Sequence, residues 1–459
     1  MSLHVESALG YHGSPLAYSD RDTIVTICGN ALRFHNVTNK QETFLWGADR
    51  GVSTFAVNRK SKLVAYAAKG EEPTIYLHQL PDFQLLETYT EIAELDVVGI
   101  AFSRLGDRMV TVAKEPDQKL IVWDVENGKK VVESVTTVEG EFVTVCPADA
   151  DLICVLGNGV CTVFEIELNY KQYEVIARQI EFEEEFVPIC HEWIPGGFLY
   201  IGCEGGQVVV ANAKTGQLLP CGEGCNWANL YAPVCSLAVH KDHLLVSTLN
   251  GVLRFFEHAA LEDSHSTLNM IEEIQLVGEE QELEVTAMAY NPTFDQLHFA
   301  TNEASLFKIS LKGDSMEEHP DLSPNKRFAA VTPVAEYHCG AVTGVVALPS
   351  GEHFASCGVD GTLRLWHARS RALLHKRQFS SQQSSLACSA SAGMLALGSS
   401  EGVLRLLSFK AGGAEGEPQV TYRSRLHDKA LSLLAFSPSG LLVAAVGADG
   451  RMFVHSSGL

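Results

Sequence analysis

A repeat returns about every 45 residues in this chain, and it restricts the possible folds more than any other feature. Its clearest copy, 338–366, reads HCGAVTGVVALPSGEHFASCGVDGTLRLW, and a copy near the end of the sequence reads LHDKALSLLAFSPSGLLVAAVGADGRMFV. A His precedes an Asp-Gly turn by the same interval in both: His338 precedes Asp360, and His427 precedes Asp449. A period of this length with Asp-Gly turns is typical of four-stranded β-propeller blades. The search for function therefore turns to binding surfaces as well as catalytic groups.

The rest of the chain consists of short apolar, β-branched runs bounded by Gly, Asp, Asn and Pro, which predicts strands. Helical periodicity is almost absent, and its strongest candidate is 266–276. We count nine repeat units and an incomplete tenth, whereas one propeller typically holds about four to eight blades. We therefore predict a seven-bladed propeller in 1–338 and about three blades of a second propeller, the last incomplete, in 339–459.

Two alternatives to this division stay open. Three blades without a ring would expose unpaired strand edges, which folded proteins avoid. Either the chain is then the front part of a longer product, or the count of units is wrong. The other alternative is one ring of eight or nine blades with a flanking piece.

Four residues in the 338–366 repeat match the hydrogen-bonded tetrad of WD40-type blades: His338, Ser356, Asp360 and Trp366. Resemblance to that family implies a chain of hydrogen bonds from the indole through the hydroxyl and the imidazole to the carboxylate. Buried polar groups are costly unless they are paired, so such a chain would lock two turns of a blade together. The His, Ser and Asp also resemble a hydrolase triad. We favour the structural role because the repeat places these groups inside a blade.

Two other repeats keep part of the tetrad: Asp117 and Trp123 in one, His427 and Asp449 in the other. In the first, Ala113 stands at the expected Ser position. In the second, Ala445 and His455 replace the Ser and the Trp. We therefore expect strand packing, rather than the tetrad, to hold most blades together.

Charge and motifs exclude several kinds of chemistry. The net charge of −22 argues against a nucleic-acid backbone or an anionic membrane as the main partner. The sequence has no P-loop motif, and Cys221 with Cys225 resembles only half of a zinc site because no second CxxC exists. No apolar run approaches the length of a membrane helix. We expect no catalytic residues, no cofactor and no metal.

Three polar segments lie outside the repeat pattern. The acidic clusters 181–186 and 272–284 are interpreted as solvated loops and strand ends, with contact to a basic partner as the alternative. The proline-containing insertion 312–333 is longer than an ordinary blade turn. It is either disordered or a partner-binding loop, and we favour disorder. The 12 cysteines mostly lie in apolar runs, which indicates small buried side chains in a reducing compartment.

The beginning of the chain carries a more specific resemblance. It reads GYHGSP, then DTIVTICGNALRFHNVTNKQETFLWG, then GVSTFAVNRKSKLVAYAAKGEEPTIYLHQLPDFQLLETY. These segments resemble the first two blades of the cilia- and flagella-associated WD-repeat proteins, in particular the pair that forms the tether and tether head of an inner dynein arm. The resemblance extends over 8–459 and is specific over about 8–130. Shared features are Gly29–Asn30 before an apolar strand and the LPDFQLL turn.

This resemblance implies a non-enzymatic scaffold of the ciliary or flagellar axoneme, with a cytoplasmic, cytoskeletal location. It would help to tether an inner dynein arm to the doublet microtubule and so support ciliary motility. The implied partners are axonemal proteins, namely dynein-arm or tether subunits and a second WD-repeat protein of the same family. A general cytosolic adaptor, in a transport coat or as a ubiquitin-ligase receptor, is the alternative. An enzyme is the third and least favoured class.

Overall fold

The computed structural model describes residues 15–47, 50–136, 142–183, 186–219, 230–240, 243–258, 268–276, 283–310, 331–389, 391, 393–409 and 417–457. All regular secondary structure in these segments is β, arranged as ten antiparallel sheets. The chain divides into two compact units, Met1–Ala335 and Glu336–Leu459. None of the described segments forms a helix long and apolar enough to cross a membrane.

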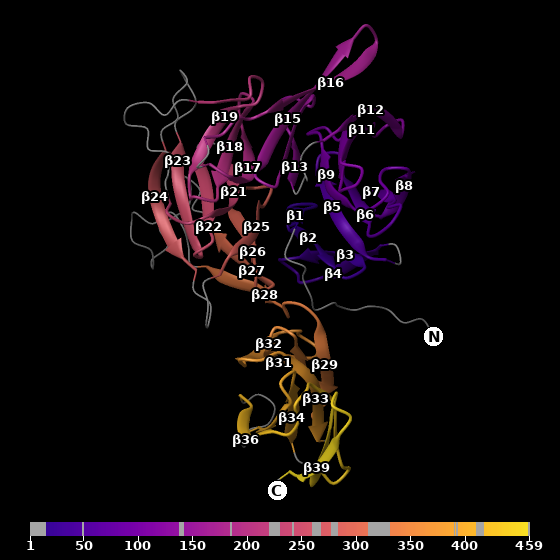
Figure 1. Cartoon of the computed structure of the whole chain (residues 1–459), viewed down its shortest axis with the longest axis vertical. Helices are drawn as coiled ribbons and strands as arrows, with labels where there is room; N and C mark the ends of the chain where they lie inside the picture. Colours follow the sequence, from indigo (N-terminus) through magenta and orange to yellow (C-terminus); the bar gives the residue numbers. More distant parts are fainter. Residues whose placement is uncertain are drawn as a thin grey trace. The chain divides into compact units, whose positions relative to one another are not determined.

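The first unit contains seven four-stranded sheets, numbered here 1 to 7 in chain order (Figure 1). Sheet 1 consists of β1 (Ala17–Tyr18), β2 (Thr23–Cys28), β3 (Ala31–Asn36) and β4 (Glu42–Trp46), and sheet 2 of β5 (Val52–Asn58), β6 (Leu63–Ala68), β7 (Ile75–Gln79) and β8 (Gln84–Tyr89). Sheet 3 consists of β9 (Val97–Phe102), β10 (Arg108–Ala113), β11 (Lys119–Asp124) and β12 (Lys129–Val135), and sheet 4 of β13 (Phe142–Val145), β14 (Leu152–Gly157), β15 (Val160–Asn169) and β16 (Gln172–Gln179). Sheet 5 consists of β17 (Pro188–Ile194), β18 (Phe198–Cys203), β19 (Val208–Asn212) and β20 (Gln217–Leu218). Sheet 6 consists of β21 (Val234–His240), β22 (His243–Thr248), β23 (Val252–His258) and β24 (Leu268–Gln275). Sheet 7 consists of β25 (Val285–Tyr290), β26 (Gln296–Thr301), β27 (Ser305–Ser310) and β28 (Thr332–Glu336).

Burial within a sheet follows the position of the strand. In sheet 2, every residue of β6 (LVAYAA) is buried, whereas β8 (QLLETY) is exposed except for Tyr89. A strand buried on both faces reads as a continuous apolar run, because sheets cover it from both sides. The apolar runs of the sequence are therefore the middle strands of sheets that stack face to face.

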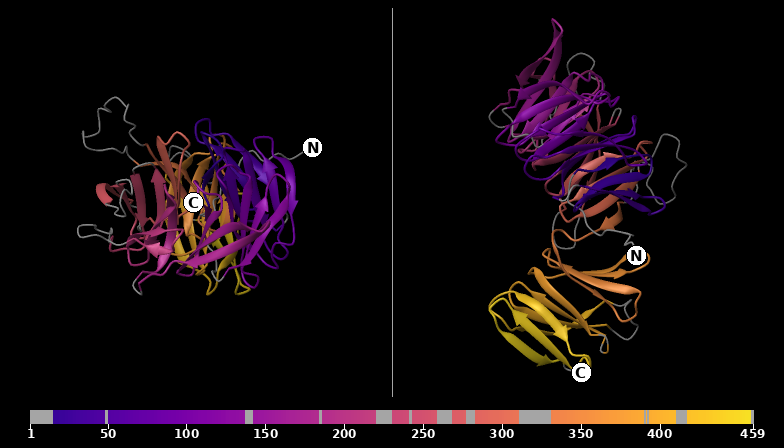
Figure 2. Two further views of the ribbon diagram at one scale, coloured as in Figure 1. Left: turned by 90° about the horizontal axis from the view of Figure 1, so that it is seen from above. Right: turned by 90° about the vertical axis from the view of Figure 1, so that its right-hand side faces the viewer.

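The core of the first unit lies between neighbouring sheets rather than at one centre. Tyr89 of sheet 2 packs edge-on against Trp123 of sheet 3, with ring centroids 4.8 Å apart. The last such cluster joins Tyr18 and Ile24 of sheet 1 to Ala300 of sheet 7. In the right view of Figure 2 the indigo strands of sheet 1 lie beside the salmon strands of sheet 7. Since each sheet also packs against the next one along the chain, the seven sheets close on themselves. The predicted all-β propeller architecture is confirmed.

The second unit holds three further sheets, numbered 8 to 10. Their strands are β29 (Val342–Ala347), β30 (His353–Gly358), β31 (Thr362–His367), β32 (Leu373–Gln378); β33 (Gln383–Ser389), β34 (Met394–Ser399), β35 (Val403–Ser408), β36 (Gln419–Arg425); β37 (Leu431–Phe436), β38 (Leu442–Gly447) and β39 (Met452–Ser456). Leu397 and Leu404 are fully buried in the two clusters that join these sheets.

Three observations from the sequence can be compared with the fold. The weak helical periodicity noted at 266–276 does not correspond to a helix, because 268–275 is β24, the outer strand of sheet 6. Its alternation of exposed and half-buried residues suits a strand covered on one face only. The division between the two units at 335 and 336 lies beside the boundary expected at 338 and 339. The insertion 312–333 lies almost wholly outside the described residues.

Candidate functional site

The structure brings the four residues of the expected tetrad together in sheet 8. The Trp366 indole N–H donates to Ser356 Oγ at 2.8 Å, and this hydroxyl lies 2.7 Å from His338 Nε2. His338 Nδ1 lies 3.0 Å from Asp360 Oδ2. Since Ser356 accepts the indole proton, its own proton is free for Nε2, and Nδ1–H then donates to the carboxylate. The four groups form one continuous chain of hydrogen bonds.

Backbone and side-chain donors surround the carboxylate of Asp360. The amides of Cys339 and Thr362 both donate to it, and so does the Thr362 hydroxyl at 2.9 Å. Burial would raise the pKa of Asp360, but hydrogen bonding and attraction to His338, with the Thr362 bonds, lower it to about 2. The ionised carboxylate therefore holds the β30–β31 turn against the segment that precedes β29.

This geometry differs from that of a hydrolase triad. The Ser356 side chain is buried, with 4% of the residue exposed, and both of its hydrogen bonds go to tetrad members. A nucleophile needs an open approach for the substrate and a hydroxyl free to attack. The arrangement can support architecture, and it offers no place for a reacting carbonyl beside Ser356.

The repeat in sheet 10 keeps half of this chain. His427 Nδ1 lies 2.9 Å from Asp449 Oδ1, as in sheet 8. Ala445 removes the hydroxyl, and His427 Nε2 is buried without a hydrogen-bond partner among the described residues. His455, at the Trp position, also has a buried Nε2 without a partner there. With Ala445 and His455 at the Ser and Trp positions, two buried ring nitrogens have no hydrogen-bond partner among the described residues.

In sheet 3, the spacing from the Trp led to the wrong residue at the position of the tetrad Ser. Trp123 Nε1 donates to Thr111 Oγ1 at 3.0 Å, so Thr111, rather than Ala113, occupies the Ser position. The strand register shows why, since Met109 lies opposite Trp123 as Phe354 lies opposite Trp366. The turn between β10 and β11 is longer than the turn between β30 and β31, which shifts the count from the Trp.

Asp117 in the same sheet accepts a backbone hydrogen bond equivalent to one that Asp360 accepts in sheet 8. Its carboxylate accepts the Glu94 amide at 2.6 Å, as Asp360 accepts the Cys339 amide. Ala93 stands where His338 stands in sheet 8. Sheet 3 therefore has the hydrogen bond from the indole to the hydroxyl and the one from a backbone amide to the carboxylate, but it lacks the histidine that links these two bonds in sheet 8.

A related polar link in sheets 4 and 5 was missed by the sequence analysis. Trp193 Nε1 donates to Thr144 Oγ1 at 2.7 Å, and that hydroxyl lies 2.7 Å from His191 Nε2. The sequence His191-Glu192-Trp193 could have indicated this link, because residues two apart on a strand lie on the same face of the sheet. Burial lowers the pKa of His191 to about 4, so its ring is neutral and accepts the Thr144 proton.

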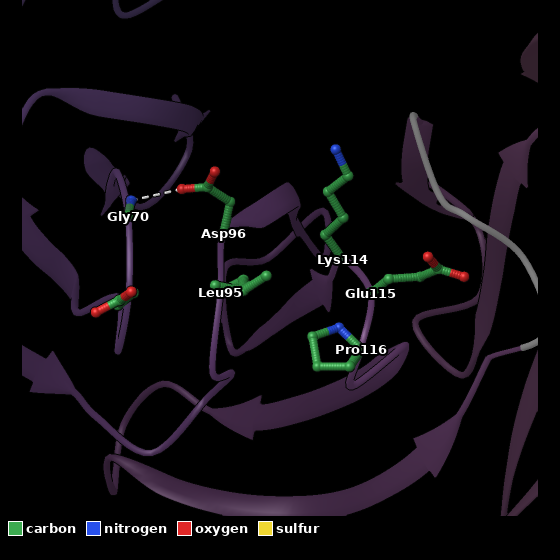
Figure 3. Close-up of a pocket in the computed structure, with 7 residues that line it drawn as sticks. Gly70, Leu95, Asp96, Lys114, Glu115 and Pro116 are labelled. Carbon is green, nitrogen blue, oxygen red and sulfur yellow. Dashed lines mark hydrogen bonds between the residues drawn. The ribbon is translucent and has the colours of Figure 1, made fainter.

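A surface pocket of about 540 Å³ lies between sheets 2 and 3, beside the β6–β7 and β10–β11 turns (Figure 3). Three loops form it, 69–74, 90–96 and 114–118, and they are tied together at Asp96. The Gly70 amide donates to the Asp96 carboxylate at 2.5 Å, and the Lys114 amide donates to the Asp96 carbonyl at 3.0 Å. Figure 3 shows Lys114 and Glu115 extending away from this junction.

The side chains of the pocket suit binding rather than reaction. Its ionisable members are three carboxylates and one ammonium: Glu71, Asp96, Glu115 and Lys114. None is paired with a Ser, Cys or His that could act as a nucleophile or base. The pocket can accept hydrogen bonds and ion pairs from a partner with cationic groups.

The described segments bring no three His, Cys, Asp or Glu side chains together as a metal site requires. Cys221 and Cys225 lie outside those segments. The ten cysteines that can be described are free thiols, and most are buried.

Comparison with known proteins agrees with the fold. The family model for the WD domain, G-beta repeat, matches residues 332–367, which contain the complete tetrad. The chain is 26% identical to cilia- and flagella-associated protein 43 of Chlamydomonas reinhardtii, over 99% of this chain and 32% of the relative. It is 20% identical to the Mus musculus protein of that name, over 99% of this chain and 29% of the relative. WD repeat-containing protein 90 of Homo sapiens is 22% identical over 98% of this chain and 25% of its own length.

A solved structure is also similar, the Cps50 (Swd1) β-propeller domain of Myceliophteria thermophila. It has a TM-score of 0.43 and 12% identity, covering 76% of this chain and 93% of that one. The propeller assignment rests instead on the sheets and their packing described above. The chain spans about a third of the length of the cilia- and flagella-associated relatives. The chain thus has a β-propeller architecture with a WD repeat at 332–367, and over 99% of its length its sequence is similar to cilia- and flagella-associated protein 43.

Proposed function

We propose that the chain is a non-enzymatic WD-repeat scaffold of the ciliary or flagellar axoneme. The observation that carries this proposal is the similarity to cilia- and flagella-associated protein 43 over 99% of the chain. The structure supports a scaffold because the triad-like residues are buried and bonded to one another. Propellers offer broad rigid faces to partners, and here the exposed pocket carries charges for contact rather than for catalysis.

The finer role is tethering of an inner dynein arm to the doublet microtubule, which would support ciliary motility. It follows from the resemblance of the first two blades to tether and tether-head proteins. The partners are then dynein-arm or tether subunits and a second WD-repeat protein of the same family. The tetrad residues are structural in this proposal, and the partner contacts lie on the loops and outer strands.

The domain organisation fits the same proposal. Residues 1–338 form one seven-bladed propeller, and 339–459 form the first blades of a second. Support comes from the cluster that joins sheet 7 to sheet 1, and from the packing of sheets 8, 9 and 10 in series. Each ring or partial ring would present its own set of turns to partners.

The test is affinity purification of the tagged chain from solubilised axonemes, under conditions that retain a known dynein-arm component. We expect dynein-arm or tether subunits to be recovered. The pocket variant E71K/E115K should reduce recovery, and the distant variant D82K/E126K, with the same charge change, should not. Recovery of coat or ubiquitin-ligase subunits without axonemal proteins would replace this proposal by the adaptor alternative.

A further inference from the structure

The hairpin of β15 and β16 extends beyond the rest of sheet 4 (Figure 1). With 10 residues, β15 is the longest described strand. Near the turn, Leu168 pairs with Tyr173, while Leu168 is 65% exposed and Tyr170 at the turn is 97% exposed. An apolar residue alone on a surface is ordinary, but exposed apolar residues gathered at a projecting tip indicate a contact site.

The two faces of the tip have opposite chemistry. Leu168 and Tyr173 lie on the face that continues, closer to the ring, into the core cluster between sheets 3 and 4. Glu167 and Glu174 lie directly opposite each other on the other face. Like charges in this position destabilise a strand pair. Within the described residues, neither carboxylate forms an ion pair, and Glu174 accepts only a 3.4 Å hydrogen bond from Asn169.

The turn itself has an unfavourable sequence for its geometry. Tyr170 and Lys171 both have positive φ, 44° and 70°, as a two-residue type I′ turn requires. The turn at the other end of β15 meets the same demand with Asn158 and Gly159, the residues that tolerate it best. Side chains at strained positions often serve a purpose other than folding. Folding does not require Tyr170, whose side chain is almost fully exposed.

We propose that this hairpin tip, with the outer edge of β16, binds an extended segment of a partner protein in which apolar and basic residues alternate. β16 is the last strand of its sheet, and its outer edge pairs with no described strand. A strand added there would continue the alternation of the sheet. Its apolar residues would lie beside Tyr173, and its Lys or Arg residues would lie beside Glu174.

The charges select this occupant over two others. A second copy docked through the same tip would bring Glu167 and Glu174 together with their own equivalents. An anionic membrane would face the same carboxylates on a chain of net charge −22. A basic extended segment removes the repulsion that the free hairpin carries. This inference goes beyond the ciliary role and does not depend on it.

The test uses the full chain and three fluorescein-labelled peptides, KLKLKLKLK, KSKSKSKSK and ELELELELE. Fluorescence anisotropy should show at least about tenfold tighter binding of KLKLKLKLK than of either other peptide. The variant E167K/E174K should reverse the charge preference and select ELELELELE. The control D82K/E126K has the same net charge as that variant and should keep the preference of the original chain.

A second variant tests binding without harming the fold. Y170N/K171G installs the preferred type I′ pair, so the unfolding temperature should stay equal or rise. Affinity for KLKLKLKLK should nevertheless fall about fivefold or more, because the exposed ring is lost. An equal loss of binding in E167K/E174K and D82K/E126K would overturn the proposal, since attraction to the net charge would then explain it, and so would equal binding of KSKSKSKSK.

Two more measurements check the other occupants. Dimerisation in analytical ultracentrifugation that Y170N/K171G abolishes would overturn the proposal in favour of a second copy. Sedimentation with phosphatidylserine vesicles that the same variant abolishes would overturn it in favour of a membrane. Failure of the peptide test leaves the purification test of the ciliary role unaffected, because that test compares pocket variants and not hairpin variants.

Discussion

The Tyr18 hydroxyl donates to His298 Nδ1 and so joins the first and seventh sheets, across 280 residues of sequence. Burial, with repulsion from Asp22 and Asp295, raises the pKa of Tyr18, so this hydroxyl keeps its proton. Burial, followed by repulsion from Lys308 and His35, lowers the pKa of His298 to about 4. A neutral ring can then accept the Tyr18 proton. The pair lies at the cluster that closes the ring of sheets.

Tyr18→Phe should therefore weaken ring closure. It leaves His298 with no described hydrogen bond, because Nε2 is already buried without a partner in the described part of the chain. Leaving one such group unpaired costs about 1–3 kcal/mol. Hydrogen exchange followed by mass spectrometry should show faster exchange in β2 and β26 and no change in sheets 8 to 10. The exposed Tyr422→Phe is the control, and equal effects of both variants would contradict the expectation.

Ser356→Ala should destabilise the second unit by about 2–4 kcal/mol, because it leaves both His338 Nε2 and the Trp366 indole N–H unpaired. Exchange in β30 and β31 measures the effect. Ser432→Ala removes only an exposed bond to a backbone carbonyl, so it should change little. A loss no larger than that of the control would show that the tetrad contributes nothing to stability.

The reverse substitution, Ala445→Ser, tests the same chemistry in sheet 10. It offers a hydroxyl to His427 Nε2, which is buried and unpaired there. We expect a gain of about 1 kcal/mol, the usual net value of a hydrogen bond. Slower exchange in β37 and β38 would report this gain. A loss of stability would mean that the fully buried position cannot accept the larger side chain.

Thr111→Val should cost about 1–3 kcal/mol, because the buried Trp123 indole N–H loses its acceptor while the packing volume is kept. Thr111→Ser keeps the hydroxyl and should cost much less. Adding Ala113→Ser to Thr111→Val should not restore stability, since Ala113 lies four residues along β10 from Met109, the partner of Trp123, whereas Thr111 lies two. Restoration by that second substitution would support the spacing-based assignment over the register, as measured by exchange in β10 and β11.

Glu192→Gln should stabilise the first unit at pH 8 and not at pH 5. Burial, opposed by a hydrogen bond from the backbone of Trp193, raises the pKa of Glu192 to about 7. A raised carboxyl pKa means that stability is lost as pH rises from the usual range through 7. At pH 8 the gain on replacement should be about 1–3 kcal/mol, and at pH 5 near zero.

Chemical denaturation at the two pH values measures this difference. Glu126→Gln is the matched control, because Glu126 is exposed in the turn after β11. A gain that is the same at pH 5 and pH 8 would show that shape, rather than charge, explains the effect of Glu192→Gln.

Much of the fold could be predicted because its signals are local. Asp-Gly turns, strand alternation and a regular period are properties of short segments, so the sheets and the tetrad residues of 338–366 could be named in advance. The weak helical periodicity at 266–276 is misleading because an outer strand with one covered face mimics amphipathic periodicity. Local patterns of that kind are settled by the neighbouring strand and not by the segment.

The candidate site was harder to predict, because its contacts depend on register and on neighbours from other sheets. Counting back from Trp123 reached Ala113, and only strand pairing showed that the longer turn moves Thr111 into place. The bond from Trp193 to Thr144 crosses from one sheet to the next, so no spacing within one repeat predicts it.

By itself, the amino-acid sequence determined that this chain forms successive four-stranded blades, because turn residues and apolar alternation act within each repeat. It also determined the chemistry of the complete tetrad, whose members all lie in one repeat. Tertiary structure alone decided that Tyr18 meets His298, that Glu192 is desolvated, and that the tip at Tyr170 projects into solvent. These features depend on which sheets pack together and where packing ends, and distances of that kind are set by the closed ring.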